Sequence, residues 1–209
     1  MKRKKKSSAE AMPIVTSLKP QRNNKRVNVY LDGEFAFGID LDNLVKFGIK
    51  VEREFSQKEI NKIIHEAEFA KTYNKLLNFA TLRPRSESEL FSWLKRKKVP
   101  VTIHRKLFIR LKRLDLVDDT KFAKWWINQR LEFKLKSKKE LKYELRQKGI
   151  DRNIIDEVLI ESAIDEEKIA KKLLSRRRFK DNRKAFAFLA RKGFDFNTIQ
   201  NVVKYTGGE

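Results

Sequence analysis

Apolar and polar residues alternate along residues 27–39, which is the pattern of a β-hairpin. The sequence RVNVYLDGEFAFGI alternates on both sides of Asp32-Gly33, and such a pair predicts a tight turn because both of its residues tolerate a positive φ angle. Residues 14–18 can add a third strand, and we expect the small sheet to pack against a helix. The alternation predicts two matching faces: Val27, Val29 and Leu31, opposite Phe35, Phe37 and Ile39.

After residue 40 the apolar spacing becomes helical. The segment DLDNLVKFGIK predicts a short helix that ends near Gly48. Ser56 and Glu59 have the spacing of a capping box, in which a hydroxyl and a carboxylate each bond a free backbone N–H group. A long helix from there to about residue 80 follows from this spacing.

The rest of the chain contains three copies of one three-helix sequence pattern. Each copy has an apolar-Ala-Lys triplet in its first helix and a capping residue before its second helix. The triplets are Phe69-Ala70-Lys71, Phe122-Ala123-Lys124 and Ile169-Ala170-Lys171, and the capping residues are Ser86, Ser137 and Asp181. Ser86 and Ser137 stand three residues before a Glu and predict two further capping boxes.

The end of the second helix differs between the copies. Gly149 and Gly193 follow that helix at the position where a left-handed backbone favours glycine. Lys98 stands there in the first copy, so we expect this copy to end its helix differently, with help from Pro100.

These patterns predict a mainly α protein, a tandem array of three three-helix repeats behind a small N-terminal module of a β-hairpin and a helix. Units of this size bury little alone, so we expect them to stack into an elongated, curved array. The predicted boundaries are a disordered basic tail at 1–12, the N-terminal module at 13–66, helical repeats at 67–117, 118–163 and 164–205, and a flexible C-terminus at 206–209.

Composition narrows the class of function. The chain has 209 residues, a formal net charge of +22 and no cysteine, which excludes disulfides and thiolate chemistry. No apolar run approaches the ~18 residues of a membrane span. The basic start MKRKKKSSAEAMP lacks the apolar core of a secretory signal. We therefore expect a cytoplasmic protein with no membrane contact and with a polyanionic or acidic partner.

The positive charge is concentrated around the second helix of each repeat. Lys and Arg outnumber Asp and Glu by 11 to 2 in residues 83–113, by 10 to 4 in residues 124–152 and by 10 to 1 in residues 171–192. Such phased blocks indicate a surface that follows a regular, negatively charged partner. The alternative is a solvated face, because Lys and Arg are good helix formers.

The candidate binding residues are cations of these blocks, which we name the basic stripe: Arg83, Arg85, Lys95, Arg96, Lys97, Lys98, Lys138, Lys139, Lys142, Arg146, Lys148, Arg176, Arg177, Arg178, Lys180 and Arg191. Trp125 and Trp126 cannot both face a core, because adjacent helical residues point about 100° apart. We expect one of them to pack between repeats, with base stacking as the alternative.

Groups for catalysis are not gathered in the sequence. His65 and His104 are the two histidines, and neither has a neighbouring cluster of carboxylates. Asp118-Asp119 fits a helix N-cap better than a metal site, and Glu166-Glu167 holds the matching place in the next repeat. We therefore expect no enzyme activity, no catalytic residues, no metal and no cofactor.

The segments RPRSESEL, LVDDTKFA and ELRQKGI, together with VYLDGEFAFGI, resemble the bacterial regulatory protein family RecX. The resemblance covers nearly the whole chain from about residue 14, and the hairpin is similar to the extended form of the family. The chain departs from the family at Lys98, where glycine is usual, in its basic leader, and in FKLKSKKEL, where members often have a glycine-containing loop.

The resemblance implies a non-enzymatic modulator of the RecA recombinase. It would lie in the groove of the RecA–DNA filament, bridge successive protomers and restrain ATP hydrolysis, strand exchange and filament growth. The corresponding expectation is a monomer that binds the RecA filament. It would bind single- or double-stranded DNA more weakly and without sequence preference. A second class stays open: a DNA-binding helical repeat protein without a RecA target.

Overall fold

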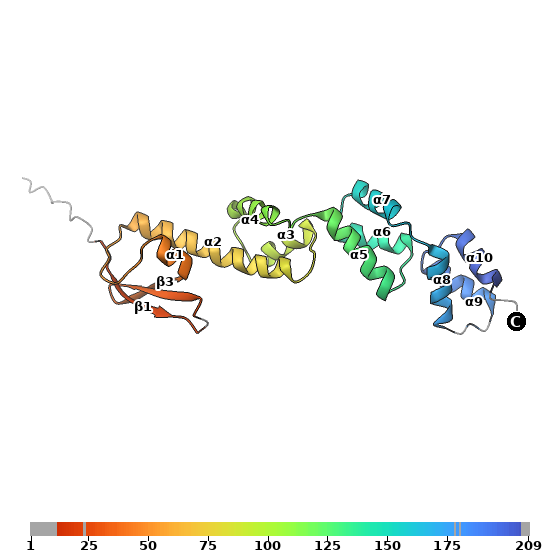
Figure 1. Ribbon diagram of the computed structural model, residues 1–209, viewed down its shortest axis with the longest axis horizontal. Coiled ribbons are helices and arrows are strands. Elements are labelled where there is room, and N and C mark those ends of the chain that lie inside the picture. Colours follow the sequence, from red (N-terminus) through yellow and green to blue (C-terminus); the bar gives the residue numbers. More distant parts are fainter. Residues whose placement is uncertain (1–11, 23, 178, 180, 206–209) are drawn as a thin grey trace, which may run out of the picture. The chain divides into compact units, whose positions relative to one another are not determined.

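The computed structural model describes residues 12–22, 24–177, 179 and 181–205 (Figure 1). The rest of the predicted tail, Arg178, Lys180 and the predicted C-terminus lie outside the described residues. The chain forms two compact units, Met1–Lys75 and Leu76–Glu209, and the boundary between them falls inside a long helix. The boundaries predicted for the module and the repeats stay predictions.

The first unit contains an antiparallel three-stranded sheet in the order β1-β2-β3. Its strands are β1 Val15–Pro20, β2 Arg26–Leu31 and β3 Glu34–Asp40. Asp32 and Gly33 join β2 to β3 with φ angles of 51° and 91°. The predicted hairpin and its third strand are therefore confirmed.

One residue of the hairpin departs from the predicted alternation. Val29 pairs with Phe37, but the next residue of β2, Tyr30, pairs with Phe35, so the register shifts at this point. The prediction that Phe35 shares the buried face of Phe37 is wrong, because Phe35 is 59% exposed. The physical reason is a β-bulge, which inserts an extra residue and turns the side chains beyond it to the other face.

Two helices of this unit follow the sheet. Helix α1, Leu41–Lys46, begins at the N-cap Asp40. Helix α2, Gln57–Thr81, begins with the predicted capping box, in which the Ser56 N–H donates to Glu59 and the Glu59 N–H donates to Ser56 Oγ. Residues of α2 share one apolar core with the inner face of the sheet: Val15, Val29, Phe37 and Ile39 of the sheet, and Ile60, Ile63 and Ala67 of the helix.

The second unit contains the three-helix repeats. Their helices, after the last turns of α2, are α3 Glu87–Arg96, α4 Val101–Arg113, α5 Asp119–Phe133, α6 Lys138–Gln147, α7 Arg152–Glu161, α8 Glu166–Ser175, α9 Asn182–Arg191 and α10 Phe196–Tyr205. Ten helices and three strands are thus present among the described residues, and the predicted fold class is confirmed.

Each repeat has its own apolar core. Phe122, Leu141, Leu145 and Ile155 are fully buried in the second repeat, and related cores lie within the first and third. Trp126 is buried with these residues. Trp125 is half-buried against the same core, and the Arg83 guanidinium of the first repeat lies 5.4 Å from its ring. The packing of one tryptophan between repeats stays a prediction.

The first repeat ends its second helix as the other two do, contrary to the prediction. Lys98 adopts a φ of 52°, close to the 75° of Gly149 and the 83° of Gly193. The N–H groups of Lys98 and Val99 bond the carbonyls of Lys95 and Leu94, which is the bond pattern found after α6 and α9. A lysine therefore occupies a left-handed position that usually takes glycine.

Candidate interaction surface

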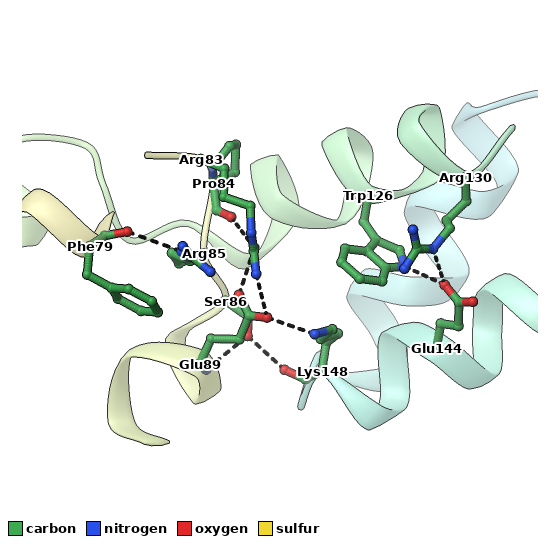
Figure 2. Close-up of polar contacts among 10 residues, drawn as sticks. All are labelled: Phe79, Arg83, Pro84, Arg85, Ser86, Glu89, Trp126, Arg130, Glu144 and Lys148. Carbon is green, nitrogen blue, oxygen red and sulfur yellow. Dashed lines mark hydrogen bonds and ion pairs between the residues drawn. The ribbon is translucent and has the colours of Figure 1, made fainter. Parts of the chain in front are cut away.

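The second helices of the three repeats, α3, α6 and α9, meet end to end. Ser86 caps α3 by accepting the Glu89 N–H at 3.1 Å, and its hydroxyl donates to the Lys148 carbonyl after α6 at 2.8 Å (Figure 2). Ser137 does the same between α6 and α9, with 3.2 Å to the Glu140 nitrogen and 2.7 Å to the Lys192 carbonyl. One buried hydroxyl thus satisfies a free N–H of one helix and a free carbonyl of another.

A second hydrogen bond accompanies each serine. The Glu87 N–H at the start of α3 donates to Asp119 at 2.8 Å, and the Lys138 N–H at the start of α6 donates to Glu166 at 3.0 Å. Asp118 caps α5 through the Lys121 N–H. The structural role expected for Asp118-Asp119 is confirmed. Burial raises the pKa of Asp119 above its ordinary value, and the nearby Glu87 and Asp118 carboxylates add to this although the Glu87 N–H opposes it.

These contacts explain the two glycines and the lysine. A Cβ added to Gly149 would lie 2.5 Å from the Ser88 Cβ of the preceding repeat, and one added to Gly193 would lie 3.1 Å from Ser137 Oγ. Lys98, at the matching position of the first repeat, is exposed. Lys98 therefore needs the left-handed backbone but does not need the absence of a Cβ. We call the contacts between α3 and α6 the first joint, and those between α6 and α9 the second joint.

The first joint also holds a charged cluster. Arg83 donates two hydrogen bonds to the Glu89 carboxylate, at 2.9 and 3.0 Å, and Lys148 donates one at 2.8 Å (Figure 2). Burial acts to raise the pKa of Glu89, but the bonds from Arg83 and Lys148 outweigh it, so the pKa lies below its ordinary value. The Ser-x-x-Glu motif is therefore not the reciprocal capping box that was predicted, because the carboxylate turns to these cations.

A neighbouring cluster in α5 and α6 was not found from the sequence. The Glu144 carboxylate accepts hydrogen bonds from the Trp126 indole at 2.9 Å and from Arg130 at 2.6 Å (Figure 2). The Arg130 guanidinium lies 4.0 Å from the Trp126 ring centroid, and the Lys148 amine lies 4.7 Å from it. A Glu 18 residues after a Trp forms no local sequence pattern, so this contact is not predictable from spacing.

Four members of the basic stripe are engaged within the protein. Arg83 and Lys148 bind Glu89, Lys142 pairs with Asp156, and Arg85 donates to the Phe79 carbonyl at 3.2 Å. Burial lowers the pKa of Arg85 from its ordinary value, and the Arg83 charge adds to this. These side chains stabilise the repeats whether or not they also meet a partner.

Other members of the basic stripe are exposed. Lys95, Arg96, Lys97 and Lys98 lie at the end of α3, Lys138 and Lys139 at the start of α6, Arg146 near the end of α6, and Arg176 and Arg191 in the third repeat. Within the part of the chain that the structure describes, none of these nine side chains forms an ion pair. Arg177 lies 5.0 Å from the ring of Phe188.

One hollow brings members of the stripe together. Arg83, Arg85, Arg96 and Lys148 line a depression of about 300 Å³ beside the first joint, together with Glu89 and the hydroxyl-bearing Ser88 and Ser92. Four cations against one carboxylate make this hollow suited to an anionic group.

The described residues do not gather the side chains of a metal site. Of the residues described, no three from His, Asp and Glu lie close enough to hold a metal ion. His65 is exposed, and His104 is half-buried with Nε2 at 2.9 Å from the Val99 carbonyl. None of the described helices is both long and apolar enough to cross a membrane.

Comparison with known proteins identifies relatives along most of the chain. Family models for the regulatory protein RecX N-terminal domain and for the second three-helix domain of RecX match residues 13–56 and 118–159. The regulatory protein RecX of Bacillus licheniformis is 32% identical over 211 residues, which cover 95% of this chain and 79% of that protein. The one of Bacillus subtilis is 32% identical over 200 residues, 90% of this chain and 75% of that protein.

A solved structure extends this likeness to three dimensions. A crystal structure of regulatory protein RecX matches with a TM-score of 0.67 at 26% identity, and the match covers 91% of this chain and 98% of the other. A relative that is 32% identical over more than two thirds of both chains establishes the family, and the crystal structure agrees with it in fold. The chain belongs to the RecX family of regulatory proteins.

Proposed function

We propose that the protein is a non-enzymatic regulator of homologous recombination that binds the RecA–DNA filament along its groove. It acts in the cytoplasm as a monomer and inhibits the RecA ATPase, strand exchange and filament growth. Family membership supports this target, since the relatives named above are regulatory proteins called RecX.

The observation that carries the proposal is the cationic hollow at the first joint, together with the exposed lysines at the end of α3 and, beside the second joint, at the start of α6. Shared hydrogen bonds hold the three repeats to one another, so several weak contacts can act at once on one extended partner. An acidic protein surface and DNA phosphate both match this charge.

The test reverses exposed charges and leaves the joints intact. One variant carries Lys95→Glu, Lys97→Glu and Lys98→Glu, a second carries Lys138→Glu and Lys139→Glu, and a third combines both sets. Each lost contact at a partly solvated interface is worth on the order of 1 kcal/mol, so each set should weaken RecA ATPase inhibition by roughly tenfold or more, and the combination by more than either.

The matched control reverses two exposed lysines of α2, Lys58 and Lys62, and should leave inhibition unchanged. Circular dichroism checks that all variants keep their helicity. Binding to bare DNA is measured beside the ATPase at two salt concentrations. Loss of DNA binding with intact RecA inhibition would favour the direct DNA-binding class. If neither DNA binding nor RecA inhibition changes, the basic stripe is only a solvated face.

A further inference from the structure

The outer face of the N-terminal sheet carries an exposed aromatic pair that the proposed function does not use. Tyr30 of β2 and Phe35 of β3 lie edge to face, with ring centroids 5.9 Å apart. Phe35 is 59% exposed, and Tyr30 is half-buried. Helices α1 and α2 cover the other face of the sheet, where Val29, Phe37 and Ile39 are buried (Figure 1).

The exposure of Phe35 is produced by the bulge in β3. Without the register shift after Val29 and Phe37, strict alternation would place Phe35 on the buried face. The same end of the sheet is fixed by Thr16, whose hydroxyl accepts the Gly33 N–H at 3.0 Å and donates to the Tyr30 carbonyl at 3.3 Å. The large ring of Phe35 is therefore not buried in the core but lies beside Tyr30. Bulges often re-aim side chains in this way next to functional sites.

Positive charge and amide groups surround the pair. The Lys19 amine lies 4.7 Å from the centroid of the Tyr30 ring, and Arg26 donates from the same face to the Gly38 carbonyl. Gln21 donates to the Asn28 side chain at 2.7 Å. Gly38 adds no side chain there, and a Cβ at this position would lie 2.8 Å from the Gln21 amide nitrogen. The face is thus polar beside its aromatic rings, and it is hollowed where Phe35 and Gly38 line a depression together with Glu68 and Lys71 of α2.

We propose that this outer face binds single-stranded nucleic acid, with bases stacked on Tyr30 and Phe35 and with Lys19 and Arg26 near the phosphates. Exposed aromatics with flanking cations are the usual platform for unpaired bases, because each base has a π-face and each phosphate a negative charge. Paired bases are already stacked on one another and cannot use the rings. The site belongs to the first unit and needs neither RecA nor the basic stripe.

The experiment measures binding of the full-length protein to a fluorescein-labelled oligo-dT strand and to an abasic strand of the same length by anisotropy. Phe35→Ala and Tyr30→Ala should each weaken oligo-dT binding by at least about fivefold, since stacking on one aromatic is worth roughly 1–3 kcal/mol per base. Binding of the abasic strand should stay unchanged. Phe35→Trp should restore oligo-dT binding, because it restores the ring.

The matched control is Tyr143→Ala, which removes a tyrosine of α6 that is 64% exposed and should not alter binding. Circular dichroism checks that each variant keeps its fold. The proposal is overturned by oligo-dT affinity of a variant carrying both Tyr30→Ala and Phe35→Ala within twofold of the wild type, by an equal loss on the abasic strand, or by no oligo-dT binding at all. No RecA is present, so the result is independent of the RecA proposal.

Discussion

The two joints of the second unit use the same hydrogen bonds but differ in their charges. In both, a buried serine bonds a carbonyl of the next repeat and a backbone N–H bonds an acidic residue of that repeat, at 2.7–3.0 Å. In the first joint the carboxylate after the serine, Glu89, bonds Arg83 and Lys148. In the second joint Glu140 bonds only Lys136 of its own repeat, at 3.0 Å, among the contacts that the structure describes.

The consequence for Glu140 is an incomplete set of bonds. Its Oε2 atom is buried and has no hydrogen-bond partner in the described chain. Lys134 stands where the first joint has Arg83, and a lysine cannot reproduce the two parallel bonds of a guanidinium. Backbone and hydroxyl contacts therefore define where two repeats meet, while the ion pairs add a stability that differs between the joints.

The largest effect is expected from Ser86→Asp and Ser137→Asp. An aspartate can still cap its helix, but it cannot donate a hydrogen bond to the carbonyl of the next repeat and would place a buried charge against it. We expect each change to lower the free energy of unfolding by about 3–5 kcal/mol, and by similar amounts because the two joints share this device. Urea unfolding followed by circular dichroism measures the effect.

The matched control for these variants is Asp181→Ser. Asp181 caps α9 from an exposed position, by accepting the Lys184 N–H at 2.8 Å. Serine caps equally well, so the free energy of unfolding should change by less than about 0.5 kcal/mol. A mild effect of both serine-to-aspartate changes would contradict the assigned role of the shared hydroxyl.

The second prediction compares how tightly the glycine of each joint packs against the neighbouring repeat. Gly149→Ala introduces a left-handed alanine and a Cβ 2.5 Å from Ser88, whereas Gly193→Ala has 3.1 Å to its nearest neighbour. The left-handed backbone costs about 1–2 kcal/mol at both positions, and overpacking adds about 1–3 kcal/mol at Gly149 and less at Gly193. Hydrogen exchange of the amides in α6 and α9 should show a greater loss of protection in Gly149→Ala than in Gly193→Ala. Equal losses would mean that the first joint relaxes.

Much of this architecture is readable from the sequence, because capping residues and apolar spacing act locally. Ser56, Ser86, Ser137 and Asp181 each cap the helix predicted from them. The bonds from Ser86 to Lys148 and from Ser137 to Lys192 span 62 and 55 residues, so no local pattern indicates them. The sequence feature related to these bonds is that a serine and a Lys-Gly pair recur together, and this feature by itself predicts only helix caps.

Charge was the less predictable property. The sequence does not distinguish a lysine or arginine that faces solvent from one that binds an internal carboxylate. The basic stripe therefore included both Arg83 and Lys95, although only Arg83 is bound to Glu89. The exposed position of Phe35 was missed for another reason, since a β-bulge changes which residues share a face without changing the alternation of letters.

The third prediction tests the charged clusters directly. Glu89→Gln removes a carboxylate that binds two cations and should lower the free energy of unfolding by about 1–3 kcal/mol. Glu140→Gln removes a carboxylate with one buried oxygen unpartnered and should cost less than about 1 kcal/mol. Chemical unfolding of both variants at pH 7 gives the comparison, and a larger cost at Glu140 would contradict it.

Acid provides an independent measure of the same cluster. The pKa of Glu89 is lowered in the folded protein, so its contribution is present above its unfolded pKa of about 4.3 and is lost as the pH falls through the folded pKa. The stability difference between wild type and Glu89→Gln should therefore be full at pH 7 and shrink below about pH 4. The raised pKa of Asp119 changes the free energy of unfolding with pH in the opposite direction. Asp119 is present in both proteins, so its contribution cancels in this difference.

The smallest effect on stability is expected from Lys98→Gly. The substitution relieves a left-handed lysine but increases the freedom of the unfolded chain, so the two terms largely cancel and the net change should stay within about 0.5 kcal/mol. Gly149→Lys, the reverse exchange at the matching position, should be far more damaging because Ser88 occupies the space of its Cβ. A lysine that contributes so little to the fold but lies exposed at the end of α3 is better explained by its charge. Lys98→Gly should therefore weaken RecA inhibition about two- to fivefold at low salt, by the roughly 0.5–1 kcal/mol of one rim contact, and less at high salt. Unchanged inhibition at both salt concentrations, with unchanged unfolding, would remove Lys98 from the interaction surface.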